Sequence, residues 1–225
     1  LSSRRLLGML KTTLLLSFIL VGEISAAQSK WLNLFDGSNL DQWRTYQCNC
    51  TTDGWIIVNN ELVRKGPARD LITKEKFKNF ILELEWNISK GGNSGIILRA
   101  NEREQYSFMS GIEMQILDDF NHPDGANTLT SAGSVYGLYP NLTNATNPFG
   151  EWNKVRIIAF DNSIKFFLNS QLINSVSIGS NSWNKAVSKS KFKSLKNFGS
   201  SLYGHIVLQD HGNEVSFRHI KIRKL

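Results

Sequence analysis

The sequence predicts an all-β fold, a two-sheet antiparallel sandwich of jelly-roll type. Three observations lead to this prediction. The chain has 225 residues, 41% of them hydrophobic, which is enough for one sizeable core. Short runs of alternating apolar and polar residues follow one another from residue 55 to the end, separated by turn residues. Only one stretch, near 181–191, has the composition of a helix.

The first 27 residues have the pattern of a targeting segment. Two adjacent arginines precede the apolar run "LLLSFILV" (14–21), which is too short to span a bilayer as a mature helix. The small residues "SAA" (25–27) follow at the positions of a cleavage site. We therefore expect a signal peptide over 1–27, a mature domain over 28–225, and an exported protein, either periplasmic or secreted.

The strands can be assigned in order from alternation and turn signals. "WIIV" (55–58) and "ELVRK" (61–65) flank Asn59-Asn60, a hairpin signal. "NFILELEWNIS" (79–89) alternates apolar and acidic residues, as a half-buried strand does. The remaining expected strands are "IILRA" (96–100), "SGIEMQILDD" (110–119), "GSVYGLYP" (133–140), "EWNKVRIIAF" (151–160), "SIKFFLN" (163–169), "QLINSVSI" (171–178), "GHIVLQDHG" (204–212) and "EVSFRHIKIRKL" (214–225).

The helix is expected over "NSWNKAVSKSKF", near 181–191, with Asn181 or Ser182 as its N-cap. The densest basic segment, 185–196, then reads as the exposed face of this helix and its exit loop. The formal net charge is +7, but Lys and Arg are otherwise scattered. We therefore expect no nucleic-acid partner, and no membrane association after signal cleavage.

The sequence offers only weak metal signals. Cys48 and Cys50, in "QCNC", form either two loop thiols or a local bridge, because two ligands do not make a zinc site. The loop "NHPDGA" (121–126) contains oxygen donors of the type that calcium prefers. No cofactor is required by the sequence, and a divalent ion is left open.

Strand alternation gathers polar side chains on one predicted face. Met114 and Ile116 point to one side of their strand, so Glu113 and Gln115 point to the other. The same reasoning applies to the strands at 96–100 and 204–212. If these strands are neighbours, their faces form a polar patch that contains Arg99, Glu113, Gln115, Gln209 and His211.

Glu113 has three interpretations from the residues alone. It is a solvated strand residue, a lone base beside an imidazole and a guanidinium, or one half of a two-carboxylate glycosidase. The last requires a second carboxyl group, and Gln115 cannot ionise. Asp118 would reach the same face only through a β-bulge.

The chain resembles the bacterial 3-keto-disaccharide hydrolases, a family long described as a domain of unknown function. The resemblance rests on "GGNSGIILR" (91–99), "GIEMQILDD" (111–119) and "LQDHG" (208–212) in this order, and extends from "WLNLFDGSNLDQW" (31–43) to the end. The departures are "CNC" and Ser170, which stands where a turn glycine is commoner. The resemblance implies a concanavalin A-like lectin/glucanase sandwich.

The resemblance also implies glycoside substrates whose sugar is oxidised to a ketone at C3. A C3 ketone acidifies the C2 hydrogen, so one base can start an elimination that expels the glycosidic oxygen from C1, and water then adds back. We expect Glu113 to be the general base and His211 the acid or the group that polarises the ketone. Arg99 and Gln115 would position substrate oxygens. Further candidates for substrate binding are Asn93, Ser94, Glu85, Asp118, Tyr136 and Gln209.

Two other functions remain compatible with this sequence. One is a non-catalytic carbohydrate-binding module, which would bind sugars on the same sandwich without consuming them. The other is an ordinary two-carboxylate glucanase, which would cleave unoxidised glucan.

Overall fold

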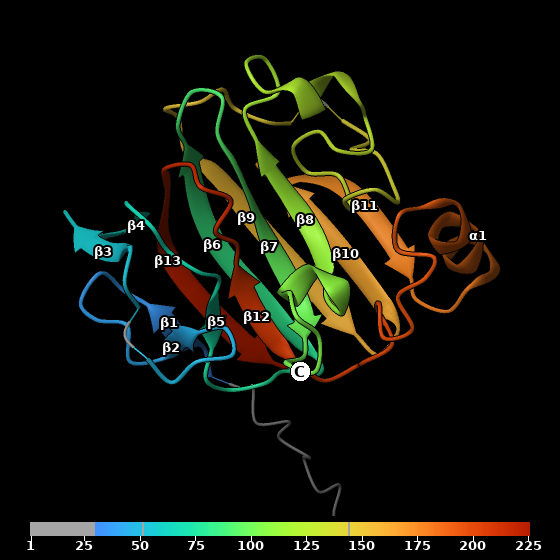
Figure 1. Cartoon of the computed structure of the whole chain (residues 1–225), viewed down its shortest axis with the longest axis horizontal. Helices are drawn as coiled ribbons and strands as arrows, with labels where there is room; N and C mark the ends of the chain where they lie inside the picture. The colour runs from blue at the N-terminus through green and yellow to red at the C-terminus, as the bar shows by residue number, and fades with distance from the viewer. Residues whose placement is uncertain (1–29, 51, 144) are drawn as a thin grey trace, which may run out of the picture.

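Two antiparallel β-sheets pack face to face in a computed structural model that describes residues 30–50, 52–143 and 145–225 (Figure 1). The expected signal peptide, 1–27, and the expected start of the domain at residue 28 lie outside the described residues. One sheet consists of β1 (Leu32–Phe35), β3 (Trp55–Val58), β4 (Glu61–Arg64), β6 (Phe80–Ile88), β9 (Asn153–Phe160), β10 (Ser163–Leu168), β11 (Gln171–Ser177) and β13 (Val215–Lys224). The other consists of β2 (Trp43–Thr45), β5 (Leu71–Thr73), β7 (Asn93–Ala100), β8 (Ile112–Leu117) and β12 (His205–Leu208).

The strand order is that of a sandwich in which sequential hairpins alternate with crossovers. The eight-stranded sheet runs β11-β10-β9-β6-β13-β4-β3, with β1 added beside β13, and the five-stranded sheet runs β2-β5-β12-β7-β8. All pairings between these strands are antiparallel. The predicted all-β, two-sheet jelly-roll sandwich is therefore confirmed.

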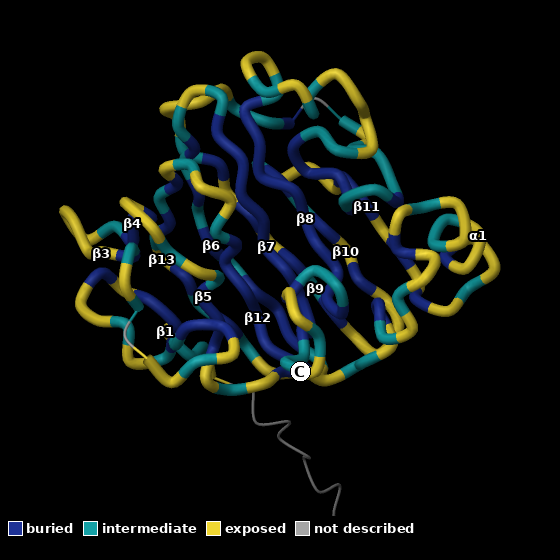
Figure 2. Tube along the Cα trace, in the orientation of Figure 1, coloured by how far each residue is buried: buried dark blue, intermediate teal, exposed yellow. Residues whose placement is uncertain are grey.

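The core lies between the sheets, and β7 and β8 of the five-stranded sheet are buried along their whole length (Figure 2). β6 has the alternation that the sequence predicts. Leu82, Leu84 and Trp86 are buried, whereas Glu83 and Glu85 point outward and remain partly exposed. Period-two alternation therefore sets which face of each strand enters the core.

Turn residues sit where the sequence places them. Asn59 and Asn60 have φ angles of 51° and 63° between β3 and β4, the left-handed geometry of a tight hairpin. Asn169 and Ser170, with φ angles of 46° and 69°, connect β10 to β11 in the same way. Ser170 thus adopts the conformation that favours glycine without disturbing the hairpin.

The helix and one expected strand differ from the sequence prediction. Helix α1 (Asn181–Lys189) is capped by Ser180, whose Oγ accepts a hydrogen bond of 3.2 Å from the backbone N–H of Trp183, so neither Asn181 nor Ser182 is the cap. Residues 133–140 form turns with isolated bridges rather than a strand. Val135 bridges both Met114 and Tyr139, so this segment covers the outer edge of β8.

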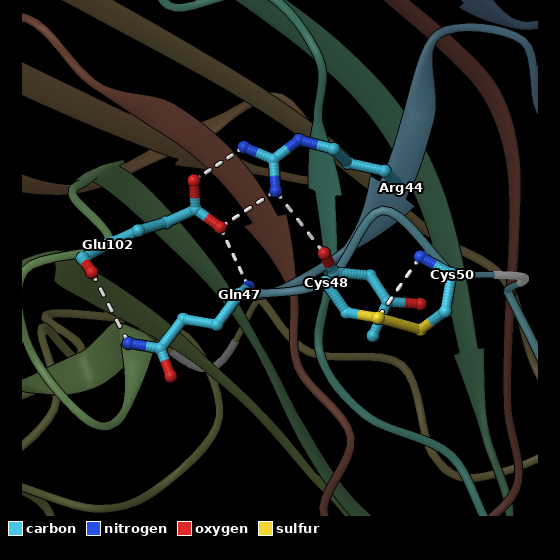
Figure 3. Close-up of a disulfide and its surroundings, with 6 residues drawn as sticks. Arg44, Gln47, Cys48, Cys50 and Glu102 are labelled. Carbon is cyan, nitrogen blue, oxygen red and sulfur yellow. Dashed lines mark hydrogen bonds and ion pairs between the residues drawn. A yellow bond between two sulfur atoms is a disulfide. The ribbon is translucent and has the colours of Figure 1, made fainter.

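Cys48 and Cys50 form a local disulfide in the loop after β2, with 5.2 Å between their Cα atoms. Figure 3 shows the surroundings of this loop. Glu102 accepts two hydrogen bonds from the guanidinium of Arg44 and one of 2.7 Å from the backbone N–H of Gln47. The loop is thereby attached to the segment that follows β7. In the part of the chain that the structure describes, no helix has the length and apolar character needed to cross a membrane.

Candidate active site

A small polar cavity of about 230 Å³ lies on the face of the five-stranded sheet that points away from the core. Met114 and Ile116 of β8 belong to the core, so Glu113 and Gln115 point to this outer face. The cavity is lined by Asn93, Phe108, Glu113, Gln115, Tyr136, Lys191, Gln209 and His211. Six of these eight residues are ones that the sequence proposes.

Neighbouring strands bring these residues together. β7 lies between β8 and β12, and Gly95 pairs with Gln115 on one side. On the other side, the backbone N–H of Gln209 donates a hydrogen bond of 2.9 Å to the carbonyl of Gly95. Gln209, Gly95 and Gln115 therefore form one row across the sheet. The expected adjacency of these strands is correct.

Gly95 leaves room for the carboxyl group of Glu113. A Cβ at position 95 would lie 2.5 Å from Glu113 Oε1 and 3.0 Å from its Cδ. The φ angle of Gly95 is not in the left-handed region, so the backbone does not require glycine there. The close approach of the carboxyl group does require it.

Glu113 is buried, with only 7% of its surface exposed. Burial disfavours the charged carboxylate and raises the pKa of Glu113 to about 8. The nearby Lys191 cation opposes this shift, the Asp70 carboxylate adds to it, and a hydrogen bond with the Gln209 side chain opposes it. A carboxyl group with a pKa near neutrality suits proton transfer better than a solvated one, and the solvated-strand interpretation of Glu113 is wrong.

The amide groups around Glu113 have unused hydrogen-bonding capacity. Both polar side-chain atoms of Gln115 are buried and make no hydrogen bond to the described residues. The same holds for Asn93 Oδ1 and Gln209 Oε1. Buried polar atoms are rarely left without partners, so this cavity is built to receive a polar ligand or ordered water.

Lys191, from the turn after α1, supplies the positive charge of the cavity. Its Nζ lies 4.2 Å from the centroid of the Tyr136 ring and 5.6 Å from that of Phe108. Burial lowers the pKa of Lys191, and the Glu113 and Asp124 carboxylates oppose that shift. Together with the Phe192 ring, at 5.3 Å, these rings hold the ammonium group where it acts electrostatically on Glu113. Lys191 belongs to the basic segment 185–196 that the sequence predicts to be exposed, yet its side chain reaches the cavity.

His211 lies on a turn that other polar residues fix. The neighbouring Asp210 accepts a hydrogen bond of 2.7 Å from Arg64 Nε, and Arg64 Nη1 donates to the carbonyl of Gly212 at 2.7 Å. Asp70 Oδ1 accepts a hydrogen bond of 2.9 Å from the backbone N–H of Asp210. His211 itself is exposed at the rim of the cavity. It can therefore meet a ligand from the solvent side.

Asp70 is the acidic group that influences Glu113 electrostatically. Its two carboxylate oxygens are already engaged. Oδ1 binds the backbone of Asp210, and Oδ2 accepts a hydrogen bond from Ser107 Oγ. Burial raises the pKa of Asp70. Asp70 thus supports the His211 turn and does not line the cavity around Glu113.

Arg99 lies apart from this cavity, contrary to the sequence prediction. It has a φ angle of 57°, and the pairing of β7 with β12 shifts register between His205 and Val207. This bulge changes the side-chain phase, so Ile97 and Ala100 share the outer face while Arg99 points toward the other sheet. There it donates hydrogen bonds of 2.8 Å to the carbonyls of Lys78 and Asp161.

Ser94 and Asp118 also lie outside the cavity. Ser94 Oγ donates a buried hydrogen bond of 2.8 Å to the carbonyl of Gln209, so it joins two strands. Asp118 Oδ2 accepts hydrogen bonds of 2.7 Å from the N–H of Gly91 and from Asn121 Nδ2. The pairing of β7 with β8 has no register shift, so no bulge turns Asp118 toward Glu113.

Glu85 lies on the eight-stranded sheet, at a larger cavity of about 620 Å³ on its outer face. Its carboxylate is 2.7 Å from Arg218 Nε, and the neighbouring Glu83 is 3.0 Å from Lys221 Nζ. The carboxylates at this cavity form ion pairs, whereas several polar atoms around Glu113 have no hydrogen-bond partner among the described residues. The Glu113 cavity is therefore the stronger candidate for the active site than the larger cavity.

Metal ligands are sparse in the described part of the chain. No group of three or more His, Cys, Asp or Glu side chains is gathered there in a way that could hold an ion. Around Glu113, the cavity lining offers His211, the Tyr136 hydroxyl and amide oxygens as further donors. The loop 121–126 folds instead as the 3-10 turn η2 (Pro123–Ala126), with His122 Nδ1 accepting from the N–H of Asp124.

Comparison with known proteins agrees with this arrangement. Residues 30–223 match the model of the 3-keto-alpha-glucoside-1,2-lyase-like domain. The chain belongs to this family. It is 31% identical to a 3-keto-disaccharide hydrolase of Bacteroides thetaiotaomicron, over 87% of this chain and 78% of the relative. The suspected relationship to 3-keto-disaccharide hydrolases is thereby confirmed.

Solved structures place the family fold among carbohydrate-active proteins. A proposed glycosyl hydrolase from Parabacteroides distasonis ATCC 8503 superimposes with a TM-score of 0.81 and 28% identity, over 87% of this chain and 94% of that chain. A beta-glucanase from Bacillus licheniformis superimposes with a TM-score of 0.51 and 10% identity, over 89% of this chain and 99% of the glucanase. The second likeness shows a shared concanavalin A-like fold and nothing about activity.

Proposed function

We propose that this chain is an exported hydrolase that cleaves 3-keto-glycosides by proton abstraction at C2, elimination at C1 and hydration. One observation carries the proposal: the cavity holds a single buried carboxyl group, Glu113, with a pKa near 8, facing unpaired amide groups and a cation. A glycosidase of the two-carboxylate type needs a second carboxyl group in the same cavity. Proton abstraction next to a ketone needs only one base.

The names of the relatives support the same chemistry. The family model is described as a 3-keto-alpha-glucoside-1,2-lyase-like domain, and the Bacteroides relative is named a 3-keto-disaccharide hydrolase. A lyase acting across C1 and C2 and a hydrolase differ only in whether water adds to the eliminated product. A two-stage reaction accounts for both descriptions.

In the first stage, Glu113 removes the proton from C2 of the oxidised sugar. The electron pair of the C2–H bond forms a C2=C3 bond, and the ketone oxygen becomes an enolate. The ketone then re-forms, the electron pair makes a C1=C2 bond, and the C1–O bond breaks. The expelled glycosidic oxygen takes up a proton, which releases the second sugar as an alcohol.

Stabilisation of the enolate is assigned to Lys191 and the amides. The ammonium group of Lys191 supplies a positive charge, and the side-chain N–H groups of Gln115 make no hydrogen bond to the described residues. Preorganised donors and charges of this kind stabilise negative charge most strongly in sites that exclude water. Lys191 thereby supplies the positive charge that Arg99, which lies apart from this cavity, cannot supply.

Protonation of the leaving oxygen is assigned to His211. It lies at the rim of the cavity, on the turn that Arg64 and Asp70 hold in place. In the second stage, water adds to C1 and a proton returns to C2, which completes hydrolysis. Protonated Glu113 is positioned to return that proton.

Export follows from the sequence pattern of residues 1–27, which we propose to be a signal peptide. The substrate would then be an oxidised oligosaccharide or glycoside met in the periplasm or outside the cell. The chemistry above calls for an oxidation that supplies the ketone at C3.

Product analysis on matched sugars tests the proposal. The protein is incubated with 3-keto-trehalose, a methyl 3-keto-glucoside, trehalose and a β-glucan, with and without chelator. Consumption of the two keto substrates alone supports the proposal. Binding without consumption would identify a carbohydrate-binding module, and cleavage of the glucan would identify a two-carboxylate glucanase.

A further inference from the structure

A second cavity, of about 440 Å³, is lined in part by residues that are close in the chain to those of the Glu113 cavity. It is lined by Tyr46, Gln47, Ala68, Arg69, Asp70, Gln105, Tyr106 and Asp210. Apart from Asp70 and Asp210, which hold the His211 turn, these residues have no part in the reaction proposed at Glu113. They nevertheless lie next to the catalytic cavity at three places along the chain.

Two short segments contribute to both cavities. Asp210 lines the second cavity, and the next residue, His211, lines the first. Tyr106 lines the second and Phe108 the first, with their rings stacked at 5.5 Å between centroids and 8° between planes. Asp70, at the second cavity, is close enough to alter the pKa of Glu113. The two cavities share no lining residue, but the consecutive residues Asp210 and His211 and the stacked rings of Tyr106 and Phe108 place them side by side.

The first cavity is too small for a whole disaccharide. Its volume of about 230 Å³ is below the range of roughly 300–1,000 Å³ that is usual for pockets holding drug-sized ligands. One oxidised ring fits beside Glu113, and the ring attached through C1 must lie outside. His211, proposed to protonate the glycosidic oxygen, directly follows Asp210 of the second cavity in the chain.

The side chains of the second cavity suit a neutral sugar. About half of the surface of Tyr106 (51%) is exposed, so its ring offers an aromatic surface for the C–H face of a pyranose. The side chain of Arg69 is exposed and makes no hydrogen bond or ion pair to other described residues. The Gln105 amide is bonded only to the Tyr106 hydroxyl, at 3.3 Å. The N–H donors can bind sugar hydroxyl groups, and the ring can stack on the sugar, so the ligand itself needs no charge.

We infer that the cavity at Tyr106, Gln105 and Arg69 binds the leaving-group sugar of the substrate. The inference rests on the proposed function, because it assigns the second ring of the same 3-keto-disaccharide. A disaccharide substrate should therefore contact this second cavity through its second ring, whereas a methyl glycoside has no second ring to place there. Interactions remote from the reacting bond contribute to kcat/KM only for substrates that reach them.

The test compares two substrates in two variants. Tyr106→Ala and Arg69→Ala are each assayed with 3-keto-trehalose and with methyl 3-keto-glucoside. We expect kcat/KM for the disaccharide to fall about tenfold in the Tyr106 variant, as loss of an aromatic contact typically gives. The value for the methyl glycoside should change less than about twofold. Tyr203→Ala is the matched control, because Tyr203 is similarly exposed, at 56%, and lines neither cavity.

The outcomes separate this inference from the proposed function. Equal effects on both substrates, or no effect on either, would overturn the second sugar site while leaving the reaction at Glu113 intact. Failure of the unaltered protein to consume either substrate would overturn the proposed function, and the sugar site with it. A selective loss with the disaccharide alone supports both.

Discussion

The carboxyl group of Glu113 occupies the space that a side chain at position 95 would need. A Cβ added to Gly95 would lie 2.5 Å from Glu113 Oε1, closer than nonbonded atoms approach. Because Gly95 has an ordinary backbone conformation, alanine would fit the strand but not the cavity. This pair of residues couples β7, on which Gly95 lies, to the proposed chemistry on β8.

Gly95→Ala should lose activity with little loss of folded structure. Displacing the Glu113 carboxyl group misaligns it with the substrate, and a misplacement of this size can cost on the order of a hundredfold in rate. The measurement is kcat with 3-keto-trehalose, accompanied by thermal unfolding. In a Glu113→Gln background the same substitution should cause little further loss, because both changes act on one group. Full activity of the Gly95→Ala protein would contradict the assignment of Glu113.

Glu113→Gln should lower kcat by at least about a hundredfold, because a positioned base typically contributes ~10²–10⁴-fold. Glutamine keeps the shape of the side chain and cannot accept the C2 proton. Gln209→Glu is unsuitable as a control, since it adds a charge to the cavity. Glu85→Gln is suitable, because that carboxylate lies on the other sheet and should leave kcat unchanged.

The pH dependence of kcat/KM should report the pKa of Glu113. The base acts in its ionised form, so kcat/KM should rise with pH and level off above about 8. Below that value, the rate should fall about tenfold for each pH unit. A profile that is flat from pH 5 to 9 would show that no such group limits the reaction.

Two substitutions should move this profile in opposite directions. The Lys191 cation lowers the pKa of Glu113, so Lys191→Met should shift the rise toward higher pH. The Asp70 carboxylate raises that pKa, so Asp70→Asn should shift the rise toward lower pH. Asparagine can keep one hydrogen bond to the N–H of Asp210, so a folded protein is expected. Shifts of the same sign would contradict the electrostatic account of the cavity.

The buried Glu113 should also lower stability at alkaline pH. Its pKa is about 8 in the folded chain and 4.5 as the ordinary value. The unfolded chain therefore loses this proton first as pH rises, and the free energy of unfolding decreases between about 4.5 and 8. Glu113→Gln should be free of this decrease. Its melting temperature, relative to the unaltered protein, should rise across that range and become constant above it.

Strand faces could be predicted from the sequence because side chains alternate with a fixed period of two. Glu113 and Gln115 share a face for this reason alone, and Gln209 and His211 follow on β12 and the turn after it. The predicted face of Arg99 was wrong because a single bulge, at which Arg99 has a φ angle of 57°, moves its side chain to the opposite face of the sheet. Alternation carries no signal of such a bulge.

The sequence could not predict which residues reach the cavity from distant segments of the chain. Lys191 lies in a turn after α1, and only the packing of that turn against Tyr136 brings its charge near Glu113. Gly95 leaves space for a side chain on another strand, which no local sequence pattern indicates. Both contacts depend on how the sandwich closes rather than on local pattern.

Hydrolysis of 3-keto-trehalose in D₂O tests the central claim most directly. If Glu113 removes the C2 proton before the C1–O bond breaks, the released 3-keto-glucose carries deuterium at C2 after correction for exchange without enzyme. A substrate labelled with deuterium at C2 should also react more slowly when proton abstraction limits the rate. A product that keeps its original hydrogen at C2, together with a C2-deuterated substrate that reacts as fast as the unlabelled one, would contradict the elimination.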